Sequence, residues 1–309
     1  MIEKVREAAG QIRRMEVQGA TNVALTALNA IVDHLKSLED TEQDHVLAEI
    51  SEAKIILFAS RETEPFMRNA VRYVEWSLKH REWTHSKFPG IVQEISDEFV
   101  EMFREARRKI VEVGTKRITE GSRVLTHCHS SAVSEVLRTA RKNGVDYELF
   151  LTETRPRYQG RITAGEMVEA GVKATMLVDS AVRTFLNRVD LVLVGSDAIT
   201  SEGNVINKIG TSLIALAAQE ARTPFYVATE LFKFDPQTIQ GDFEVIEERS
   251  PDEVWTDPPE GLTIRNPAFD ITRREYIHGI ICEEGVIPPQ SVVEAVRRRY
   301  PWILEESGP

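Results

Sequence analysis

Two side chains that can transfer protons each follow a short apolar run of the chain. Cys128 lies in the stretch RVLTHCHS, and Asp197 ends the stretch DLVLVGSD. A cysteine thiolate can take a proton from carbon, and a partly desolvated aspartate can exchange protons with a hydroxyl group. Because a helix is expected to begin just after Cys128, its backbone amides should lower the pKa of the thiol. The pair therefore indicates one soft base and one oxygen acid.

Each of these residues also has a purely structural interpretation. A lone cysteine is often a small buried hydrophobe, and an aspartate after a strand often caps the following turn. A metal site at His127, Cys128 and His129 is disfavoured, because the sequence contains no second ligand cluster with matching spacing. We therefore expect no metal, and we expect Cys282, in YIHGIICEEG, to belong to the core.

Short β-rich runs alternate with helical segments beyond residue 118. The expected strands are 124–126, 147–152, 175–178, 191–194 and 225–228. Such alternation is typical of a parallel sheet with helices on both faces, here a Rossmann-like α/β domain. Ligands of these sheets bind at the carboxyl ends of the strands. We therefore expect the polar residues that follow the strands to converge, namely Cys128, Glu153, Arg155, Asp179, Asp197, Glu230 and Lys233.

The chain before residue 118 shows helical periodicity. Apolar side chains recur at helical spacing around 23–35, from 63 onward and over 91–113. We therefore predict a helical N-terminal domain over residues 1–118 and a Rossmann-like α/β catalytic domain over residues 119–309. The acidic, proline-containing stretch 247–261 is expected to form an exposed loop before a final strand and helix.

The composition limits the kinds of partner. The 309 residues carry 38 Lys and Arg against 49 Asp and Glu, and this net charge of −11 opposes generic binding to nucleic acid or anionic membranes. Two cysteines cannot form a disulfide framework, and no apolar run approaches the length of a membrane span. The initial stretch MIEKVREAAG lacks the features of a signal peptide. We therefore expect a cytoplasmic location.

Seven short motifs link the chain to a known superfamily. They are THCHS, TETRPRYQGRITA, DSA, VGSDAI, INKIGT, FKF and NPAF. In the order and spacing of these motifs the chain resembles the superfamily that joins ribose-1,5-bisphosphate isomerase, 5-methylthioribose-1-phosphate isomerase and the alpha, beta and delta regulatory subunits of initiation factor 2B. The resemblance implies that Cys128 and Asp197 are catalytic. It also implies a set of substrate-binding residues, Gly19, Ala20, Arg61, Ser130, Gln159, Asn207, Lys208 and Lys233.

The motifs THCHS and TETRP, with the short N-terminal region, most resemble the ribose-1,5-bisphosphate isomerase branch. That branch implies conversion of ribose 1,5-bisphosphate to ribulose 1,5-bisphosphate through a cis-enediolate, in AMP catabolism and without a cofactor. Cys128 would then act on carbon and Asp197 on oxygen, while Asn207 and Lys208 would hold phosphate at a helix start. The branch further implies activation by AMP and a homo-oligomer, a hexamer built from dimers.

The chain departs from the isomerase pattern at two positions. Gln18 stands where the isomerases commonly have arginine, and Ser131 stands where the bisphosphate enzyme has lysine. Arg68, Arg155 and Arg157 are candidate replacements for these two missing cations. Two alternatives stay open as a result. One is an isomerase of another sugar 1-phosphate, such as 5-methylthioribose 1-phosphate, and the other is a non-catalytic, nucleotide-binding regulatory subunit of the initiation factor 2B type.

Overall fold

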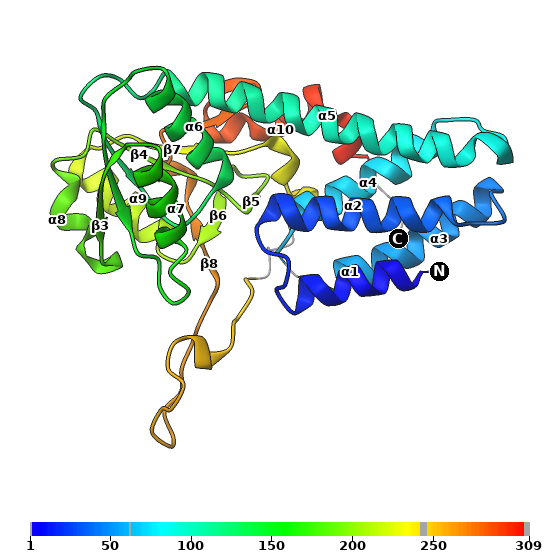
Figure 1. Cartoon of the computed structure of the whole chain (residues 1–309), viewed down its shortest axis with the longest axis horizontal. Coiled ribbons are helices and arrows are strands. Elements are labelled where there is room, and N and C mark those ends of the chain that lie inside the picture. Colours follow the sequence, from blue (N-terminus) through cyan, green and yellow to red (C-terminus); the bar gives the residue numbers. More distant parts are fainter. Residues whose placement is uncertain (1, 62, 242–245, 306–309) are drawn as a thin grey trace.

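The computed structural model describes residues 2–61, 63–241 and 246–305. Helices alone precede the first strand in these ranges: α1 (Glu3–Arg13), α2 (Ala20–Lys36), α3 (Gln43–Phe58), α4 (Pro65–Lys79) and α5 (Phe88–Thr115). They lie at one end of the molecule, and the long α5 runs from that end to the sheet (Figure 1). The helices expected from apolar spacing correspond to α2, α4 and α5, whereas the sequence pattern does not indicate α1 and α3. No helix in the described ranges is both long and apolar enough to cross a membrane.

The rest of the described chain forms an α/β unit. Its helices are α6 (Ser131–Lys142), α7 (Gly160–Glu169), α8 (Val182–Leu186), α9 (Thr211–Ala221) and α10 (Val292–Arg299). Its strands are β1 (Arg123–Thr126), β2 (Glu148–Thr152), β3 (Lys173–Leu177), β4 (Leu191–Val194), β5 (Ala198–Ile199), β6 (Val205–Lys208), β7 (Phe225–Ala228), β8 (Phe269–Thr272), β9 (Gly279–Cys282) and β10 (Gly285–Ile287). The five strands expected from the sequence correspond to β1, β2, β3, β4 and β7, which confirms the α/β fold.

The described strands form two sheets. The larger has seven strands in the order β10-β9-β7-β4-β1-β2-β3, and all neighbours pair in parallel except β10 with β9. The smaller sheet, β5-β6-β8, is antiparallel and is not indicated by the sequence pattern. The prediction of a single parallel sheet therefore misses the smaller sheet. Short strands that pair with partners far along the chain leave little pattern in the local sequence.

Cys128 and Asp197 follow two strands that are neighbours in the large sheet. β1 pairs with β4 in parallel, with Leu125 opposite Val192. The order of the chain reverses between these strands, since β2 and β3 extend the sheet on one side and β7 and β9 on the other. Such a reversal opens a crevice at the carboxyl ends of the strands. The topology thus brings both residues to one crevice.

Asn207 and Lys208 lie at the end of a strand. They close β6, where Lys208 is paired with Phe269 of β8. The helix α9 begins only at Thr211, after Gly210 has turned the chain with a φ of 105°. The expectation that Asn207 and Lys208 start a helix is therefore wrong, because their pairing with the distant β8 extends the strand through them.

An aromatic cluster joins the N-terminal helices to the α/β unit. Phe232, in the short helix η3 (Leu231–Lys233), lies 5.8 Å from Phe66 of α4, 5.2 Å from Phe99 of α5 and 4.3 Å from Tyr300, measured between ring centroids. These rings belong to a hydrophobic core that contains residues from both parts of the chain. The expected domain boundary after residue 118 falls between α5 and β1, but the two parts share this core.

The stretch 247–261 projects away from the two sheets (Figure 1). It contains a single short helical turn, η5 (Pro251–Glu253), and its Trp255 is 49% exposed. The expectation of an exposed loop is confirmed for most of the stretch, whereas the side chains of Glu247 and Arg249 at its start are largely buried. Beyond this loop the chain forms β8, β9, β10 and α10, which is more than the one strand and one helix that the sequence indicates.

Replacing Phe232 with alanine should loosen the junction between the N-terminal helices and the sheet. Loss of a fully buried aromatic ring leaves a cavity, so we expect the free energy of unfolding to fall by about 3–5 kcal/mol. Leu262→Ala, at an exposed side chain, should change it by less than about 0.5 kcal/mol. Urea unfolding followed by circular dichroism measures both values. Similar values for the two variants would contradict a structural role for the aromatic cluster.

Candidate active site

A cavity of roughly 500 Å³ opens beside the carboxyl ends of β1 and β4. The start of α2, the middle of α5, the loops after β1 and β4 and the end of β6 contribute to its walls. Every residue that the sequence marks as catalytic or substrate-binding lines it, namely Gly19, Ala20, Arg61, Cys128, Ser130, Gln159, Asp197, Asn207, Lys208 and Lys233. Gln18 and Ser131, where the expected cations are missing, line it as well. The fold thus gathers at one place residues that are widely separated in the sequence.

The backbone of Cys128 is strained and is held by neighbouring threonines. Its φ of 65° lies in the left-handed region, which costs a residue with a side chain about 1 kcal/mol. The Cys128 amide donates to Thr154 Oγ1 at 2.9 Å, and the Thr163 hydroxyl donates to the Cys128 carbonyl at 3.0 Å. Asp179 fixes Thr154 in turn, because its Oδ1 accepts the Thr154 amide at 2.8 Å. This network aims the cysteine side chain into the cavity that it lines.

The Cys128 thiol is protonated at neutral pH. Burial of the sulfur raises its pKa to about 11; the charge of Lys208 opposes this shift, and the carboxylates of Asp197 and Asp179 add to it. The expectation of a lowered pKa is therefore wrong, because desolvation outweighs both the cation and the amides near the start of α6. The thiol must therefore lose its proton before the sulfur can act as a base.

His127 is a structural residue. Its ring is buried, with Nε2 2.9 Å from the carbonyl of Ile209 and Nδ1 2.6 Å from Thr152 Oγ1. Since a carbonyl can only accept, Nε2 carries the proton and Nδ1 accepts from the threonine hydroxyl. Burial lowers the pKa of His127 to about 4, so the ring stays neutral. No group of His, Cys, Asp and Glu in the described part of the chain could hold a metal ion.

Asp197 reaches the same cavity from the loop after β4, in which Gly195 packs closely against Ser130. A Cβ on Gly195 would lie 2.4 Å from Ser130 Oγ, so only glycine allows the loop after β4 to approach the loop after β1 this closely. The Asp197 amide donates to the carbonyl of Ile206 at 2.9 Å, which anchors the residue beside β6. Its carboxylate is one of the charges that raise the pKa of Cys128, as expected for two side chains that share one cavity.

The first cluster of charges in the cavity is the Arg61 cluster. It consists of the cations Arg61 and Lys208 and the carboxyl groups of Glu64 and Glu247. Arg61 Nη1 lies 3.0 Å from Glu64 Oε2, and Arg61 Nε lies 3.6 Å from Glu247 Oε2. Arg61 and Lys208 both lie over the ring of Phe269, at 5.9 and 5.1 Å from its centroid. Burial raises the pKa of Glu64 to about 7 although Arg61 opposes the shift. Arg61 and Lys208 are therefore the cations that this cluster presents to the cavity.

The start of α2 faces the same cavity. Gly19 has a φ of 81°, and no side chain caps the first amides of the helix that begins at Ala20. Uncapped amides and the helix dipole make such a terminus suited to an anion. Gln18 lines the cavity, but its Nε2 donates to the carbonyl of Met15 at 3.1 Å. The amides at the start of α2 and the cations of the Arg61 cluster thus line one cavity, and both are suited to phosphate.

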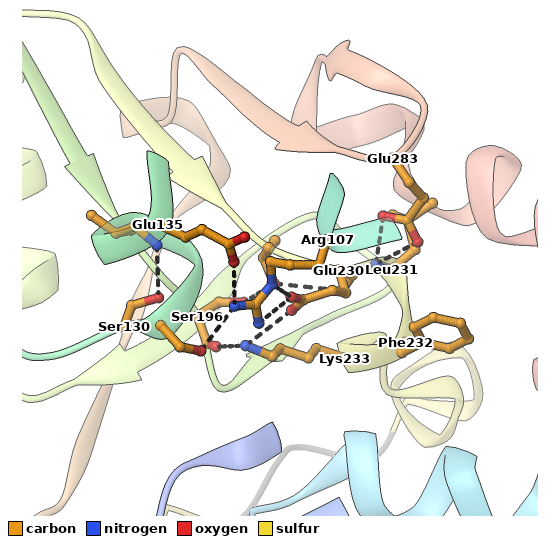
Figure 2. A network of polar contacts seen from close by, with 12 residues as sticks. Arg107, Ser130, Glu135, Ser196, Glu230, Leu231, Phe232, Lys233 and Glu283 are labelled. Carbon is orange, nitrogen blue, oxygen red and sulfur yellow. Dashed lines mark hydrogen bonds and ion pairs between the residues drawn. The ribbon is translucent and has the colours of Figure 1, made fainter. Parts of the chain in front are cut away.

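The second cluster of charges is the Arg107 cluster, which consists of the cations Arg107 and Lys233 and the carboxylate of Glu230 (Figure 2). Arg107 donates to Glu230 Oε1 from Nε at 2.7 Å, and its Nη2 lies 2.6 Å from the same oxygen. Its Nη1 donates to Ser131 Oγ at 3.0 Å. Lys233 Nζ donates to the Ser196 carbonyl at 2.7 Å and lies 3.4 Å from Glu230 Oε2. Burial alone would raise the pKa of Glu230, but the two cations outweigh it and lower this pKa to about 2.

Some residues that line the cavity are not indicated by the sequence motifs. Arg107 and Arg249 are the cations among them. One signal for Arg107 is present in the sequence: it sits between Phe103 and Ile110 on a face of α5 that is otherwise apolar. A charged residue within an apolar stripe is unusual unless it has a buried partner.

The suggested replacements for the missing cations lie elsewhere. Arg68 donates from Nη1 to Gln237 Oε1 at 2.9 Å. Arg155 and Arg157 contact the exposed loop at Val254 and Glu253. None of these three arginines is among the described residues that line the cavity. The suggestion is therefore wrong for this arrangement of the chain, because each guanidinium already has partners outside the cavity.

Comparison with known proteins gives a consistent family. The model of the initiation factor 2 subunit family matches residues 16–289. The ribose 1,5-bisphosphate isomerase of Archaeoglobus fulgidus is 44% identical over 312 residues, covering 99% of this chain and 97% of that protein. The enzyme of the same name from Methanocaldococcus jannaschii is 40% identical over 301 residues, covering 97% and 96%. The resemblance seen in the seven motifs is confirmed.

A solved structure has the same fold under a different name. The crystal structure of the Pyrococcus horikoshii OT3 translation initiation factor eIF-2B matches with a TM-score of 0.80 at 30% identity, covering 93% of this chain and 98% of that chain. Similar folds thus carry both isomerase and initiation-factor names. The fold alone does not decide the activity, so the activity has to be inferred from the residues that line the cavity.

The high pKa of Cys128 can be tested by alkylation. Because iodoacetamide reacts with the thiolate, the rate of modification should rise about tenfold for each pH unit between pH 7 and pH 9. Intact-mass spectrometry at several pH values measures this rate. Cys128→Ser is the control, since the remaining Cys282 is fully buried and its pKa is raised to about 12 by that burial. A rate that levels off below pH 8 would contradict the raised pKa.

Proposed function

The chain belongs to the initiation factor 2 subunit family, and on that basis we propose that it is an aldose-ketose isomerase that converts ribose 1,5-bisphosphate to ribulose 1,5-bisphosphate. One observation carries the proposal: a thiol, a carboxylate and two groups of cations line a single cavity. A proton-transfer pair suits isomerisation, and two cationic groups suit a substrate with two phosphates. Relatives of that name, 44% and 40% identical over nearly the whole chain, support it.

In the proposed reaction Cys128 acts on carbon and Asp197 acts on oxygen. For turnover Cys128 must be a thiolate and Asp197 must hold a proton. Cys128 thiolate then takes the proton from C2 while Asp197 gives its proton to the ring oxygen. The C1–O4 bond breaks and a cis-enediol forms between C1 and C2. Asp197 next takes the proton of the C2 hydroxyl, through the cis-enediolate, and Cys128 returns its proton to C1.

The protons and electrons of this series of reaction steps balance. One proton moves from C2 to C1, and one moves from the C2 oxygen to the C4 oxygen, so no redox cofactor is consumed. The C1 phosphate remains attached throughout. Gln159, which lines the cavity, is proposed to contact the sugar, and Gly19 and Ala20 with the Arg61 cluster are proposed to hold one phosphate.

Several broader features belong to the same proposal. They are a role in AMP catabolism, activation by AMP, a cytoplasmic location and a hexamer built from dimers. A dimer through the α/β unit is supported by apolar side chains that the single chain leaves exposed on α7, β3 and α9, namely Val168, Met176, Leu213 and Leu216. Burial of such side chains against a second copy would remove them from water.

A non-catalytic regulatory protein is the second candidate. The protonated thiol of Cys128 and the uncharged Gln18 favour it, as does the initiation-factor name of the similar solved structure. Such a protein would bind a phosphorylated ligand in the cavity without exchanging its C2 proton.

Cys128→Ser and Asp197→Asn should each lower kcat by about 10²–10⁴, because each removes one acid–base group. The assay uses ribose 1,5-bisphosphate deuterated at C2 and follows both the ketose product and the fate of the deuterium. Asp190→Asn, at an exposed carboxylate paired with Arg123, is the matched control and should retain full activity. If the wild-type protein gives neither product nor exchange with any pentose 1-phosphate, the regulatory alternative replaces the isomerase.

A further inference from the structure

The Arg107 cluster places two largely buried cations against a single buried carboxylate. The side chains of Arg107 and Lys233 are 11% and 6% exposed, and the single carboxylate between them, Glu230, is fully buried. Glu135 lies 3.8 Å from Arg107 but is 44% exposed, so solvent screens it. A buried charge without a partner is costly, and an anion removes that cost. The cluster is therefore suited to a negatively charged group of a ligand.

We propose that Arg107 binds the C5 phosphate of the substrate and makes the cavity select a doubly phosphorylated sugar over a sugar 1-phosphate. The inference rests on the proposed isomerase function and adds a specificity-determining residue to it. Arg107 lies on α5, which belongs to the N-terminal helices, whereas Cys128 and Asp197 follow strands of the sheet. The substrate would therefore bridge both parts of the chain.

The position of the guanidinium supports this role. Its Nη1 donates to Ser131 Oγ at the first residue of α6, a helix of 12 residues. Ser130 caps that helix through the Val133 amide, which leaves the amides at Ser131 and Ala132 directed toward the helix start. A phosphate at this point would meet helix amides, two serine hydroxyls and a cation. Arginine suits it, because a guanidinium has five N–H donors and can reach a phosphate oxygen while it still holds Glu230 and Ser131.

Ser131 has no charge, and the cation beside it is Arg107, which comes from α5 instead of α6. The resemblance to the isomerases implies a lysine at this position, and Arg107 now fills the space beside the serine hydroxyl. A short side chain at residue 131 is needed for that contact. The charge missing from the sequence motif is thus supplied in space by α5.

The two phosphates can be assigned to the two clusters by the elements that carry their cations. Lys208 of the Arg61 cluster closes β6, and the Ile206 carbonyl of the same strand accepts the Asp197 amide at 2.9 Å. That cluster therefore lies beside the reacting carbons and suits the phosphate on C1. The Arg107 cluster is left for the phosphate at C5. Glu230 is a positioning residue in this arrangement, because it holds Arg107 and Lys233 without lining the cavity itself.

The test compares two sugars across matched variants. Arg107→Met should lower kcat/KM for ribose 1,5-bisphosphate about ten- to hundredfold, mainly through KM, and lower it less than about threefold for ribose 1-phosphate. Arg107→Lys should recover part of the loss, since it restores charge without the guanidinium. Arg104→Met, on the same helix with a side chain 68% exposed, should leave both values unchanged. Calorimetry with ribulose 1,5-bisphosphate and ribose 1-phosphate should show the same discrimination in the dissociation constants.

A second variant guards against a simple loss of folding. Arg107→Met leaves Glu230 as a buried charge with only Lys233, so Arg107→Met/Glu230→Gln removes both members of the pair. The double variant should lose the preference for the bisphosphate as the single variant does. If either variant, folded by circular dichroism, loses affinity for both sugars equally, Arg107 has only a structural role and the inference is overturned.

Failure of the isomerase proposal would look different. In that case the wild-type protein turns over neither sugar, and calorimetry alone tests the Arg107 cluster. Binding of ribulose 1,5-bisphosphate that weakens at least tenfold in Arg107→Met would support the phosphate site without the activity. Unchanged binding in that variant, or no binding by the wild-type protein, would overturn it.

Discussion

The close contact between Gly195 and Ser130 is the constraint on which the candidate site depends. Any side chain at residue 195 would collide with the serine hydroxyl, so the loops after β1 and β4 meet only because one of them has no Cβ there. The parallel pairing of those strands brings the loops together, and the glycine lets them touch. Cys128 and Asp197 flank this contact. Their common cavity is therefore a property of the backbone, and the side chains add the chemistry.

The burial that raises the pKa of Cys128 also shapes how the pair could work. A thiol that holds its proton tightly is a poor base at rest but a strong one after deprotonation, which suits removal of a proton from carbon. The nearby carboxylate is the group that can accept the sulfur proton. Thiol and carboxylate should therefore be considered together, because the charge of Asp197 acts on the Cys128 thiol.

Local sequence patterns predict the parts of the site that depend on short segments. The strands β1 and β4 are apparent from their apolar runs, and the rule for parallel sheets then places Cys128 and Asp197 at one edge. Lys208 fails as a helix start because its partner Phe269 lies far along the chain in β8. Arg107 fails for a similar reason: its partner Glu230 is separated from it by most of the α/β unit. The pKa of Cys128 depends on how densely the folded chain surrounds the sulfur, and no short motif encodes that density.

Cys128 combines a strained, left-handed backbone with a reactive side chain. Glycine would adopt a φ of 65° without steric penalty, so mutation to glycine would relieve strain while it deletes the sulfur. The residue that supplies the sulfur to the cavity therefore also carries a conformational cost, so backbone strain and chemistry coincide in one side chain.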